Sequence, residues 1–273
     1  IVNVSYENPR LTFQTNMCGM VNVLDAIRRS SSVKAAVLIT SDKCYENLEW
    51  EYGYRETDRL GGKDPYSASK ACAEIAFSSM CRSFFTAEKC PRIATSRAGN
   101  VIGGGDWALD RIVPDCVRAW SQGKRVVIRS PGAIRPWQHV LEPASGYLYL
   151  GARLWERQES LHGESFNFGP KTESIYTVEQ VVDEMIKTWP DGSWQLDSER
   201  VAGREATLLN LSCDKAALRL GWQATLDFRE AVEMVAQWYR DYCSGKHQAL
   251  DLTRQQIGFY EQKGREQDRV WAT

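Results

Sequence analysis

The chain has 273 residues, enough for one large or two small domains, and its 43% hydrophobic and 25% charged residues are ordinary for a soluble globular protein. Its 34 basic and 35 acidic residues leave a net charge of −1, which argues against nucleic acid or an anionic membrane as a partner. No apolar run approaches the roughly 20 residues that span a bilayer, and the first residues do not have the pattern of a secretory signal.

The cysteine and histidine content argues against a metal centre. Eight cysteines are scattered along the chain, and no pair has the Cys-x-x-Cys spacing of a structural zinc site. Only three histidines are present as imidazole ligands, so we expect no catalytic metal. Free thiols are typical of a reducing compartment, and the sequence therefore predicts a cytoplasmic protein without a metal.

The first third of the chain alternates helical and strand patterns. Apolar residues at helical spacing predict a helix over residues 13–29, and the compact aliphatic run over 34–40 predicts a buried strand. The polar, glycine-containing stretch 46–62 is typical of a loop. Asp64 followed by Pro65 has the pattern of an N-cap and a first helical residue, so we expect a helix from there to about residue 85.

The same alternation continues along the rest of the chain. The predicted elements are a strand over 92–97, a glycine-rich loop over 98–105, helices over 110–120 and 141–155, strands over 126–129 and 164–168, and amphipathic helices over 177–189 and 228–242. The polar stretch from residue 247 is expected to be partly mobile. Strands that alternate with helices indicate an α/β fold, with a mainly parallel sheet whose ligands bind beyond the C-terminal ends of the strands.

The segment Tyr66-Ser-Ala-Ser-Lys70 is the strongest local signal for chemistry. Residues four apart share one face of a helix, so the phenol and the ammonium point the same way. A free tyrosine has a pKa of about 10, and a neighbouring lysine lowers it toward the range of a useful base. Such a tyrosine takes a proton from a substrate hydroxyl. Tyr-x-x-x-Lys alone also fits an exposed helix face, so its context decides between these interpretations.

That context is a resemblance carried by motifs on both sides of the pair. The motifs, in chain order, are Ser41-Asp42-Lys43, Tyr66-x-x-x-Lys70 and Arg97-Ala-Gly-Asn100. Their order resembles the extended short-chain dehydrogenase/reductase family, whose members convert nucleotide sugars. Longer strings resemble the CDP-glucose 4,6-dehydratases within that family, namely ITSDKCY, RAGNVIGGGDWALDRIVPD and AIRPWQHVLEP. The similarity covers most of the chain.

The pair Asp42-Lys43 distinguishes the branches of the family that the chain resembles. Epimerases carry no acidic and basic pair there, dTDP-glucose and GDP-mannose dehydratases carry Asp-Glu, and CDP-glucose dehydratases carry Asp-Lys, as this sequence does. The other interpretation is a strand-end turn in which the aspartate caps backbone amides. The resemblance therefore implies a lyase that dehydrates CDP-glucose to its 4-keto-6-deoxy sugar with NAD as the cofactor.

The resemblance also implies a role for each residue of these motifs. Tyr66 takes the C4 hydroxyl proton during oxidation, Lys70 holds the nicotinamide ribose, and Ser41 hydrogen-bonds the C4 oxygen. Elimination of water across C5 and C6 then needs an acid and a base, for which Asp42 and Lys43 are the candidates, and hydride finally returns to C6. Lys43 serves as a base only if its pKa falls below the usual value of about 10.4.

Arginines are expected to hold the diphosphate of the substrate, because a planar guanidinium donates two parallel hydrogen bonds to phosphate. Arg135 matches the family position for this contact, Asn100 matches an amide on the glycine-rich loop, and Arg111 and Ile112 match positions of backbone contact with the nucleotide. Each arginine also fits a solvated surface charge, and at Arg204 the two interpretations are evenly matched. The full set of expected substrate-binding residues is Asn100, Arg111, Ile112, Arg129, Arg135 and Arg204.

Cofactor contacts are implied at Asn16, which lies in an Asn-x-x-Gly helix motif, and at Thr40, Tyr66, Lys70 and Arg97. A dinucleotide fold also begins with a strand and a Gly-x-x-Gly-x-x-Gly loop that receives the diphosphate. The sequence lacks this motif, and its glycine cluster at 103–105 is interpreted as a substrate loop. We therefore expect the sequence to be part of a longer chain, and the strand over 34–40 to present an unpaired edge.

The implied fold is a Rossmann-like doubly wound parallel sheet with a smaller C-terminal α/β domain. Residues 1–101, with 136–168 packing back on them, are expected to form the remainder of the NAD-binding domain, and 102–273 most of the nucleotide-sugar domain. Helices 13–29 and 65–85 resemble a pair that forms a homodimer. The alternatives are another nucleotide-sugar dehydratase or epimerase, or a non-catalytic nucleotide-sugar-binding fragment. A catalytic chain is expected to supply deoxysugars for O-antigen and lipopolysaccharide.

Overall fold

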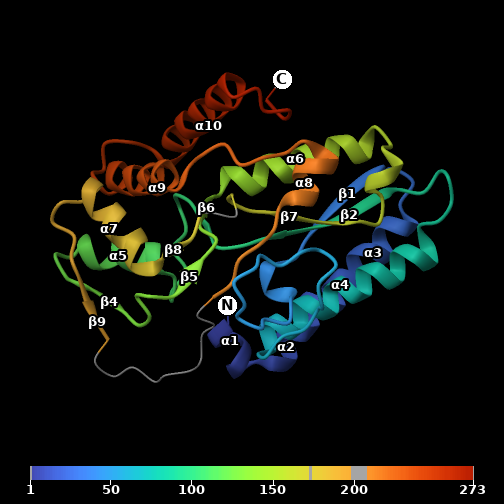
Figure 1. Cartoon of the computed structure of the whole chain (residues 1–273), viewed down its shortest axis with the longest axis horizontal. Coiled ribbons are helices and arrows are strands. Elements are labelled where there is room, and N and C mark those ends of the chain that lie inside the picture. Colours follow the sequence, from blue (N-terminus) through green and yellow to red (C-terminus); the bar gives the residue numbers. More distant parts are fainter. Residues whose placement is uncertain (1, 172–173, 198–207, 273) are drawn as a thin grey trace. The chain divides into compact units, whose positions relative to one another are not determined.

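The computed structural model describes residues 2–171, 174–197 and 208–272, which form two units (Figure 1). Unit 1 consists of residues 1–99, 144–168 and 211–221, and unit 2 consists of 100–143, 169–210 and 222–273. The expected division into 1–101 with 136–168, and 102–273, differs from these units in three stretches. Residues 100–101 and 136–143 belong to unit 2, and residues 211–221 belong to unit 1.

A parallel sheet of three strands lies at the centre of unit 1. Its order is β1 (Ala35–Ile39), β2 (Arg92–Ala98) and β7 (Ser165–Phe168), and Ile39 pairs with Ser96. Strands of a parallel sheet are joined by helical crossovers. Residues Arg92–Arg97 of β2 are buried, but in β1 only Leu38 is buried, so the expected burial of this strand is not borne out. The expected parallel sheet and its strands at 34–40, 92–97 and 164–168 are thus confirmed.

Helices cover both faces of this sheet, as a doubly wound fold requires. On one face, α3 (Gly19–Arg29) and α4 (Pro65–Phe84) lie side by side (Figure 1). Their shared core comprises Met20, Leu24, Ile27, Leu38, Ala73, Phe77, Cys81, Phe85 and Ile93. On the other face lies α6 (Leu141–Trp155), where a Cβ on Gly151 would be in ordinary van der Waals contact with the Val37 side chain, at 3.8 Å. The helix α8 (Asp214–Leu220) and the short turn η3 (Glu159–Leu161) complete this unit.

The strand β1 lies at one end of the sheet within the described residues. Its hydrogen-bonding edge away from β2 has no strand partner there, and Ile39 is 56% exposed although it belongs to a strongly apolar run. An apolar residue in an unpaired edge strand is unusual in a folded protein. Within the described residues β1 is therefore the edge strand of this sheet.

The helical N-terminal segment contains an irregular turn that the sequence did not indicate. After α1 (Val2–Glu7), the chain passes through α2 (Pro9–Phe13), the π-helical turn η1 (Gln14–Cys18) and α3 without leaving helical geometry. A π-turn inserts an extra residue per turn and is common at functional sites. Here it contains Asn16, whose Nδ2 donates to the Ser69 Oγ of α4 at 2.8 Å.

The core of unit 2 is built mainly from three amphipathic helices, α5 (Ile112–Trp120), α7 (Val178–Thr188) and α9 (Phe228–Cys243). Two-residue and three-residue strands pair around them: β3 (Val101–Ile102) with β6 (Gln138–His139), β4 (Val126–Ile128) with β9 (Trp194–Leu196), and β5 (Ile134–Arg135) with β8 (Tyr176–Thr177). Capping boxes at Thr177 and Asp227 fix where α7 and α9 begin. Unit 2 combines helices and strands as expected, but its residue ranges make it about as large as unit 1, and not smaller.

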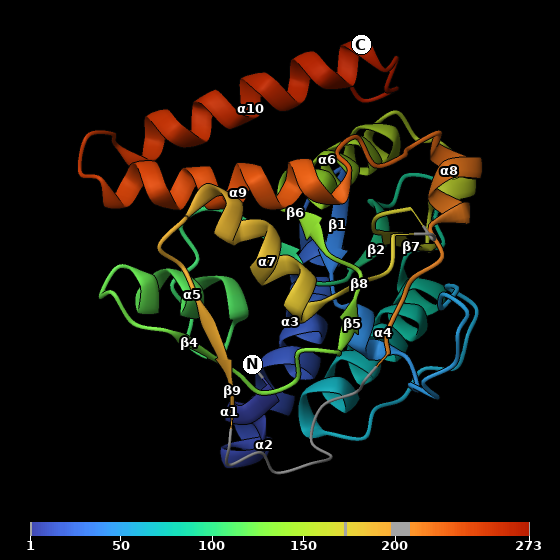
Figure 2. The same cartoon turned by 60° about the vertical axis from the view of Figure 1, so that its left-hand side comes forward.

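The C-terminal region is ordered, contrary to the prediction of partial mobility from residue 247. Helix α10 (Ala249–Glu266) runs antiparallel beside α9, as Figure 2 shows. Leu252 and Tyr260 are buried, and Tyr260 stacks on Trp271 with ring centroids 4.7 Å apart. Only a few apolar residues make this packing. Because the composition of the segment is mostly polar, the sequence did not predict the helix.

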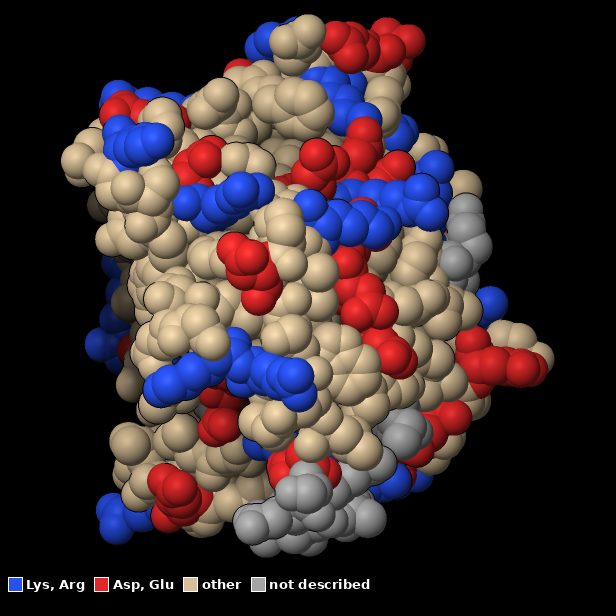
Figure 3. Space-filling view, turned by 90° about the vertical axis from the view of Figure 1, so that its left-hand side faces the viewer, with Lys and Arg blue, Asp and Glu red and all other residues tan. Residues whose placement is uncertain are grey.

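Charged side chains on the face of Figure 3, which lies over α5, α7 and α9, show lysine and arginine interspersed with aspartate and glutamate. No single-sign patch of the kind that binds a polyanion is visible on that face. None of the helices in the described residues is long and apolar enough to cross a membrane. The eight cysteines are free thiols in the structure.

Glu142, at the first turn of α6, is a buried acid within unit 2. Its carboxylate accepts hydrogen bonds from the backbone N–H groups of Thr225 and Leu226 at 2.6–3.0 Å, and from the Tyr260 hydroxyl at 2.9 Å. Burial nevertheless raises the pKa of Glu142 to about 7, despite these hydrogen bonds and the nearby Arg269. Glu142 thus ties α6 to α10 at the cost of burying a titratable group.

We expect Glu142→Gln to flatten the pH dependence of stability between about pH 4.5 and pH 7. The folded protein binds the Glu142 proton more tightly than the unfolded chain does, so the free energy of unfolding falls as pH rises through this range, by about 3 kcal/mol at most. Urea unfolding of both proteins across this range measures the difference. Glu233→Gln, on the exposed side of α9, is the control, and an unchanged slope in Glu142→Gln would refute the assignment.

Candidate active site

The motif Ser41-Asp42-Lys43 lies at the C-terminal end of β1, where a parallel sheet offers its binding edge. Ser41 caps the short helix η2 (Asp42–Cys44), and its Oγ accepts from the Lys43 backbone N–H at 3.2 Å and donates to Asp42 Oδ1 at 3.0 Å. Ser41 and Asp42 are both buried, whereas Lys43 is half-buried. The capping interaction and a chemical role for the aspartate are therefore compatible.

Tyr66 and Lys70 lie in the first two turns of α4, which begins as predicted. The Asp64 side chain accepts the Ser67 backbone N–H at 3.0 Å, and Pro65 is the first helical residue. Both Tyr66 and Lys70 are half-buried, and η2 packs against α4. Burial lowers the pKa of Lys70, against the opposing effects of Cys44 and Glu74. The two halves of the predicted catalytic set thus come together in unit 1.

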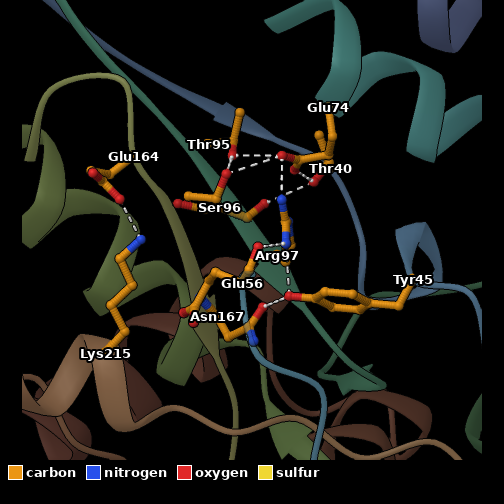
Figure 4. Close-up of polar contacts among 11 residues, drawn as sticks. Thr40, Tyr45, Glu56, Glu74, Thr95, Ser96, Arg97, Glu164, Asn167 and Lys215 are labelled. Atoms are coloured by element: carbon orange, nitrogen blue, oxygen red, sulfur yellow. Dashed lines mark hydrogen bonds and ion pairs between the residues drawn. The ribbon is translucent and has the colours of Figure 1, made fainter. Parts of the chain in front are cut away.

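Behind this set lies a buried ion pair that the sequence analysis did not predict. Arg97 of β2 donates to the Glu74 carboxylate of α4 at 2.7 Å, and both side chains are almost fully buried (Figure 4). Glu74 also accepts from the Thr40 hydroxyl at the end of β1, from Thr95 at 3.0 Å, and from Ser165 at 3.1 Å. One carboxylate thereby joins α4 to all three strands of the sheet.

The charges of this pair are fixed by their surroundings. Burial alone would raise the pKa of Glu74, but the hydrogen bond and charge of Arg97, with the bonds from Thr40 and Thr95, outweigh it and lower that pKa. Burial acts in the opposite sense on Arg97, and the Glu74 carboxylate outweighs it and raises the pKa of the guanidinium. Both groups therefore stay ionised across the physiological range, as a buried charge pair requires.

The network continues from Arg97 to the residue that follows η2. Arg97 Nη1 donates to the Tyr45 hydroxyl at 2.8 Å, which donates to Asn167 Oδ1 at 2.7 Å. Asn167, which lies near Glu56 in Figure 4, donates from its backbone N–H to the Glu56 carboxylate at 2.7 Å. Its Nδ2 donates to the carbonyl oxygen of Tyr54 at 2.9 Å. The loop over 46–62 is thereby attached to β7.

Three residues expected to contact a cofactor have protein partners in the structure. The Asn16 amide bonds Ser69, the Thr40 hydroxyl bonds Glu74, and Arg97 is engaged by Glu74 and Tyr45. For Thr40 and Arg97 the geometry is that of internal support, and cofactor contact at these positions stays a prediction. The missed residue, Glu74, had one signal in the sequence, since it lies four residues after Lys70 in an otherwise small and apolar helix face.

The expected substrate-binding residues that the structure describes lie in unit 2. Arg111 caps α5 and pairs with Asp106 at 2.8 Å, and Arg129 pairs with Asp110 at 3.7 Å, so both are partly exposed ion pairs. Arg204 lies outside the described residues.

Asn100, Ile112 and Arg135 occupy more constrained positions in the same unit. The Asn100 carbonyl accepts the Gln138 backbone N–H at 3.1 Å, and Ile112 packs against the core of the unit. Arg135 is buried in β5, and its Nη1 donates to the Ile134 carbonyl at 2.7 Å. Because its guanidinium is buried and is held by a backbone carbonyl, Arg135 is the strongest candidate of the set for binding an anion.

The glycines of the 103–105 loop are explained by close packing within unit 2. A Cβ on Gly104 would lie 2.1 Å from the Trp238 ring, and a Cβ on Gly103 would lie 2.7 Å from Val140. Gly105 has a φ of +83°, which side chains rarely adopt. The Tyr239 hydroxyl donates to the Asp106 carbonyl at 2.6 Å and further fixes the loop. In the described residues no group of His, Cys, Asp and Glu is arranged to hold a metal ion.

Comparison with known proteins decides the family. The model of the GDP-mannose 4,6-dehydratase family matches residues 1–235. The chain belongs to this family. It is also 44% identical over 260 residues to CDP-glucose 4,6-dehydratase of Salmonella typhimurium, a match that covers 93% of this chain and 72% of that protein. The resemblance stated from the motifs is therefore confirmed, and the chain is a nucleotide-sugar dehydratase by family.

Solved structures of related enzymes confirm the Rossmann-like fold. A dTDP-glucose 4,6-dehydratase from Streptomyces venezuelae, solved with NAD bound, superposes with a TM-score of 0.72 at 17% identity, over 90% of this chain and 71% of that one. UDP-glucose 4-epimerase from Thermotoga maritima superposes with a TM-score of 0.75 at 19% identity, over 88% and 74% of the two chains. Dehydratases and epimerases share this fold, so the fold alone does not select the reaction.

Proposed function

We propose that this protein catalyses the NAD-dependent dehydration of CDP-D-glucose to CDP-4-keto-6-deoxy-D-glucose. The observation that carries the proposal is the buried Asp42, next to Lys43 at the end of β1 and packed with η2 against the helix of Tyr66 and Lys70. An epimerase needs no second acid–base pair beside the tyrosine, whereas elimination of water needs one. The 44% identity to CDP-glucose 4,6-dehydratase supports the choice of substrate.

The residues of α4 fit a nicotinamide cofactor. Lys70 is half-buried, its pKa is lowered by burial, and its ammonium has no ion-pair partner among the described residues, so it suits the neutral hydroxyls of a ribose. Tyr66 and Lys70 would hold that ribose, with Asn16 beside them on the neighbouring helix. When bound, NAD supplies reversible oxidation of the sugar.

The side chains of unit 1 divide the proton transfers among them. Tyr66 takes the proton of the C4 hydroxyl, since Lys70 favours the phenolate, and Ser41 positions the C4 oxygen. Lys43 removes the C5 proton, which the neighbouring ketone makes acidic. Asp42 protonates the departing C6 hydroxyl, and water leaves. Asp42 is buried beside Ser41, which donates to its Oδ1 at 3.0 Å, so the carboxyl is held at the start of η2.

The nucleotide and diphosphate are assigned to unit 2. We place the diphosphate on the buried Arg135, with Arg129 and Arg204 as further cations, and the nucleotide against the backbone at Arg111 and Ile112. Asn100 is the amide that faces the diphosphate in this assignment. A guanidinium donates two parallel hydrogen bonds that match the geometry of a phosphate. Salt screens exposed charges more than buried ones, so high salt is expected to weaken diphosphate binding mainly at the exposed arginines.

Two further properties follow from the same proposal. The eight free thiols suit a reducing compartment, so we place the protein in the cytoplasm, where its product would supply deoxysugar synthesis for surface polysaccharide. We also assign homodimerisation to the helices over 13–29 and 65–85, which carry exposed apolar side chains at Val23, Ile75 and Phe84.

The substrate assignment is tested by side-by-side turnover of CDP-glucose, dTDP-glucose, UDP-glucose and GDP-mannose, each with NAD. Product is measured by mass spectrometry as the loss of one water from the sugar. We expect CDP-glucose to give the highest kcat/KM. A higher value for another nucleotide sugar would assign the protein to that substrate, and C4 inversion without loss of water would identify an epimerase.

A further inference from the structure

We propose that Glu74 is a positioning residue that holds Ser41, Asp42 and Lys43 at their working distance from Tyr66 and Lys70. The inference deepens the proposed function and rests on it. Glu74 itself does not touch substrate or cofactor, since its carboxylate is enclosed by protein donors. We call residues 41–44, which contain Ser41, Asp42 and Lys43, the catalytic segment. Glu74 would act through Thr40, which precedes this segment, and Tyr45, which follows it.

The first connection is direct. Thr40 is the residue immediately before Ser41, its hydroxyl donates to Glu74 Oε1, and its backbone N–H donates to the Ser96 carbonyl at 2.9 Å. Glu74 lies one helical turn after Lys70, on the same face of α4. A single hydrogen bond thus links the start of the catalytic segment to the helix of the proposed base.

The second connection passes through Arg97. Its Nη2 donates to Glu74 at 2.7 Å and its Nη1 to the Tyr45 hydroxyl at 2.8 Å, while its guanidinium lies 4.9 Å from the Tyr45 ring centroid. Tyr45 follows Cys44, the last residue of η2. The catalytic segment is therefore tied at both ends to one buried ion pair (Figure 4).

The burial of the pair makes the arrangement rigid. The Glu74 and Arg97 side chains are 2% and 3% exposed, so neither can exchange its partner for water. A purely structural pair would need no particular partners near the catalytic segment, and apolar residues often replace such pairs without loss of stability. The ion pair bonds Thr40, immediately before Ser41, and Tyr45, immediately after Cys44. Because these two residues flank the catalytic segment, we infer that the pair positions it.

Two threonines make a matched test, because both donate to Glu74 and only one adjoins the catalytic segment. Thr40 and Thr95 are both buried, and Thr95 donates to Glu74 Oε2 at 3.0 Å from the middle of β2. Thr40→Val and Thr95→Val each remove a hydroxyl that donates to the Glu74 carboxylate, at Oε1 from Thr40 and at Oε2 from Thr95. The Thr95 hydroxyl also lies 2.8 Å from Ser165 Oγ, so Thr95→Val removes at least as many hydrogen bonds. We expect Thr40→Val to lower kcat at least about tenfold more than Thr95→Val, with KM little changed, because displaced catalytic groups lose rate steeply. Thr40→Ser should recover most of the loss.

A second readout does not depend on turnover. Amide hydrogen exchange at Lys43 and Cys44, whose backbone N–H groups bond to Ser41, should quicken in Thr40→Val and stay close to that of the unchanged protein in Thr95→Val. If no nucleotide sugar is turned over, the proposed function fails and this comparison still decides the positioning role. Equal effects of the two valine variants on kcat, or on exchange where no activity is found, would overturn the inference.

A variant that leaves the ion pair intact covers the case in which Thr40→Val does not fold. Tyr45→Phe removes the hydroxyl that joins Arg97 to Asn167 and keeps the ring stacked on Tyr54. It should lower kcat and quicken exchange at Lys43 in the same way. Tyr54→Phe, which removes a hydroxyl bonded only within the loop over 47–54, is its control. Equal behaviour of these two variants would contradict the proposal.

Discussion

Tyr66→Phe is expected to lower the turnover of CDP-glucose by roughly three orders of magnitude, as loss of a general base does. Phenylalanine keeps the ring in the first turn of α4 but removes the oxygen that we propose takes the C4 proton. Lys70 remains four residues away, so binding should change little. The measurement is single-turnover kinetics, following both the reduced cofactor by absorbance and the product by mass spectrometry.

The control for this variant is Tyr242→Phe on α9, where the ring stacks on Trp238 and phenylalanine preserves the contact. It should retain turnover and melting temperature. In Tyr66→Phe we expect no reduced cofactor at any time, since oxidation is the first step. Rapid cofactor reduction with slow product formation would mean that another group takes the C4 proton and that Tyr66 acts later.

Asp42→Asn is expected to abolish elimination while oxidation at C4 continues, with product formation falling by about two to four orders of magnitude. The amide oxygen can still accept the Ser41 hydroxyl, which Asp42 Oδ1 accepts at 3.0 Å, so the fold of η2 should persist. An amide cannot donate a proton to the departing C6 hydroxyl. The variant should therefore accumulate reduced cofactor and the 4-keto sugar that still carries its C6 oxygen.

Asp25→Asn provides the matched control, since it makes the same chemical change in a surface ion pair on α3. Nucleotide binding should be unchanged in both variants, as judged by calorimetry with CDP. Product formation by Asp42→Asn at the rate of Asp25→Asn would show that Asp42 is not the acid and would leave its hydrogen bond with Ser41, the cap of η2, as its role.

Local sequence patterns predicted most of the regular elements of the fold. The β-branched runs became β1 and β2, and Asp64-Pro65 began α4 where expected, because these signals act over a few neighbouring residues. Helix α10 escaped prediction because its stability comes from packing against α9 and from Tyr260 stacking on Trp271, not from a continuous apolar stripe.

The candidate site was predictable to a similar extent. Tyr66 and Lys70 are four apart on one helix, so their shared face could be expected from spacing alone. The network around Glu74 joins residues 40, 74, 97 and 165, whose proximity depends on the order of strands in the sheet. No local pattern indicates that Arg97 would turn inward to a carboxylate instead of outward to a ligand.

The central claim is that one active site oxidises C4, removes water across C5 and C6, and reduces C6. The most direct measurement uses CDP-glucose that carries deuterium at C4, incubated with the purified protein and NAD, with the position of the label in the product determined by NMR. The account predicts that the deuterium appears at C6 of the 4-keto-6-deoxy sugar. Deuterium lost to solvent or retained at C4, or no reaction of CDP-glucose while another nucleotide sugar reacts, would contradict it.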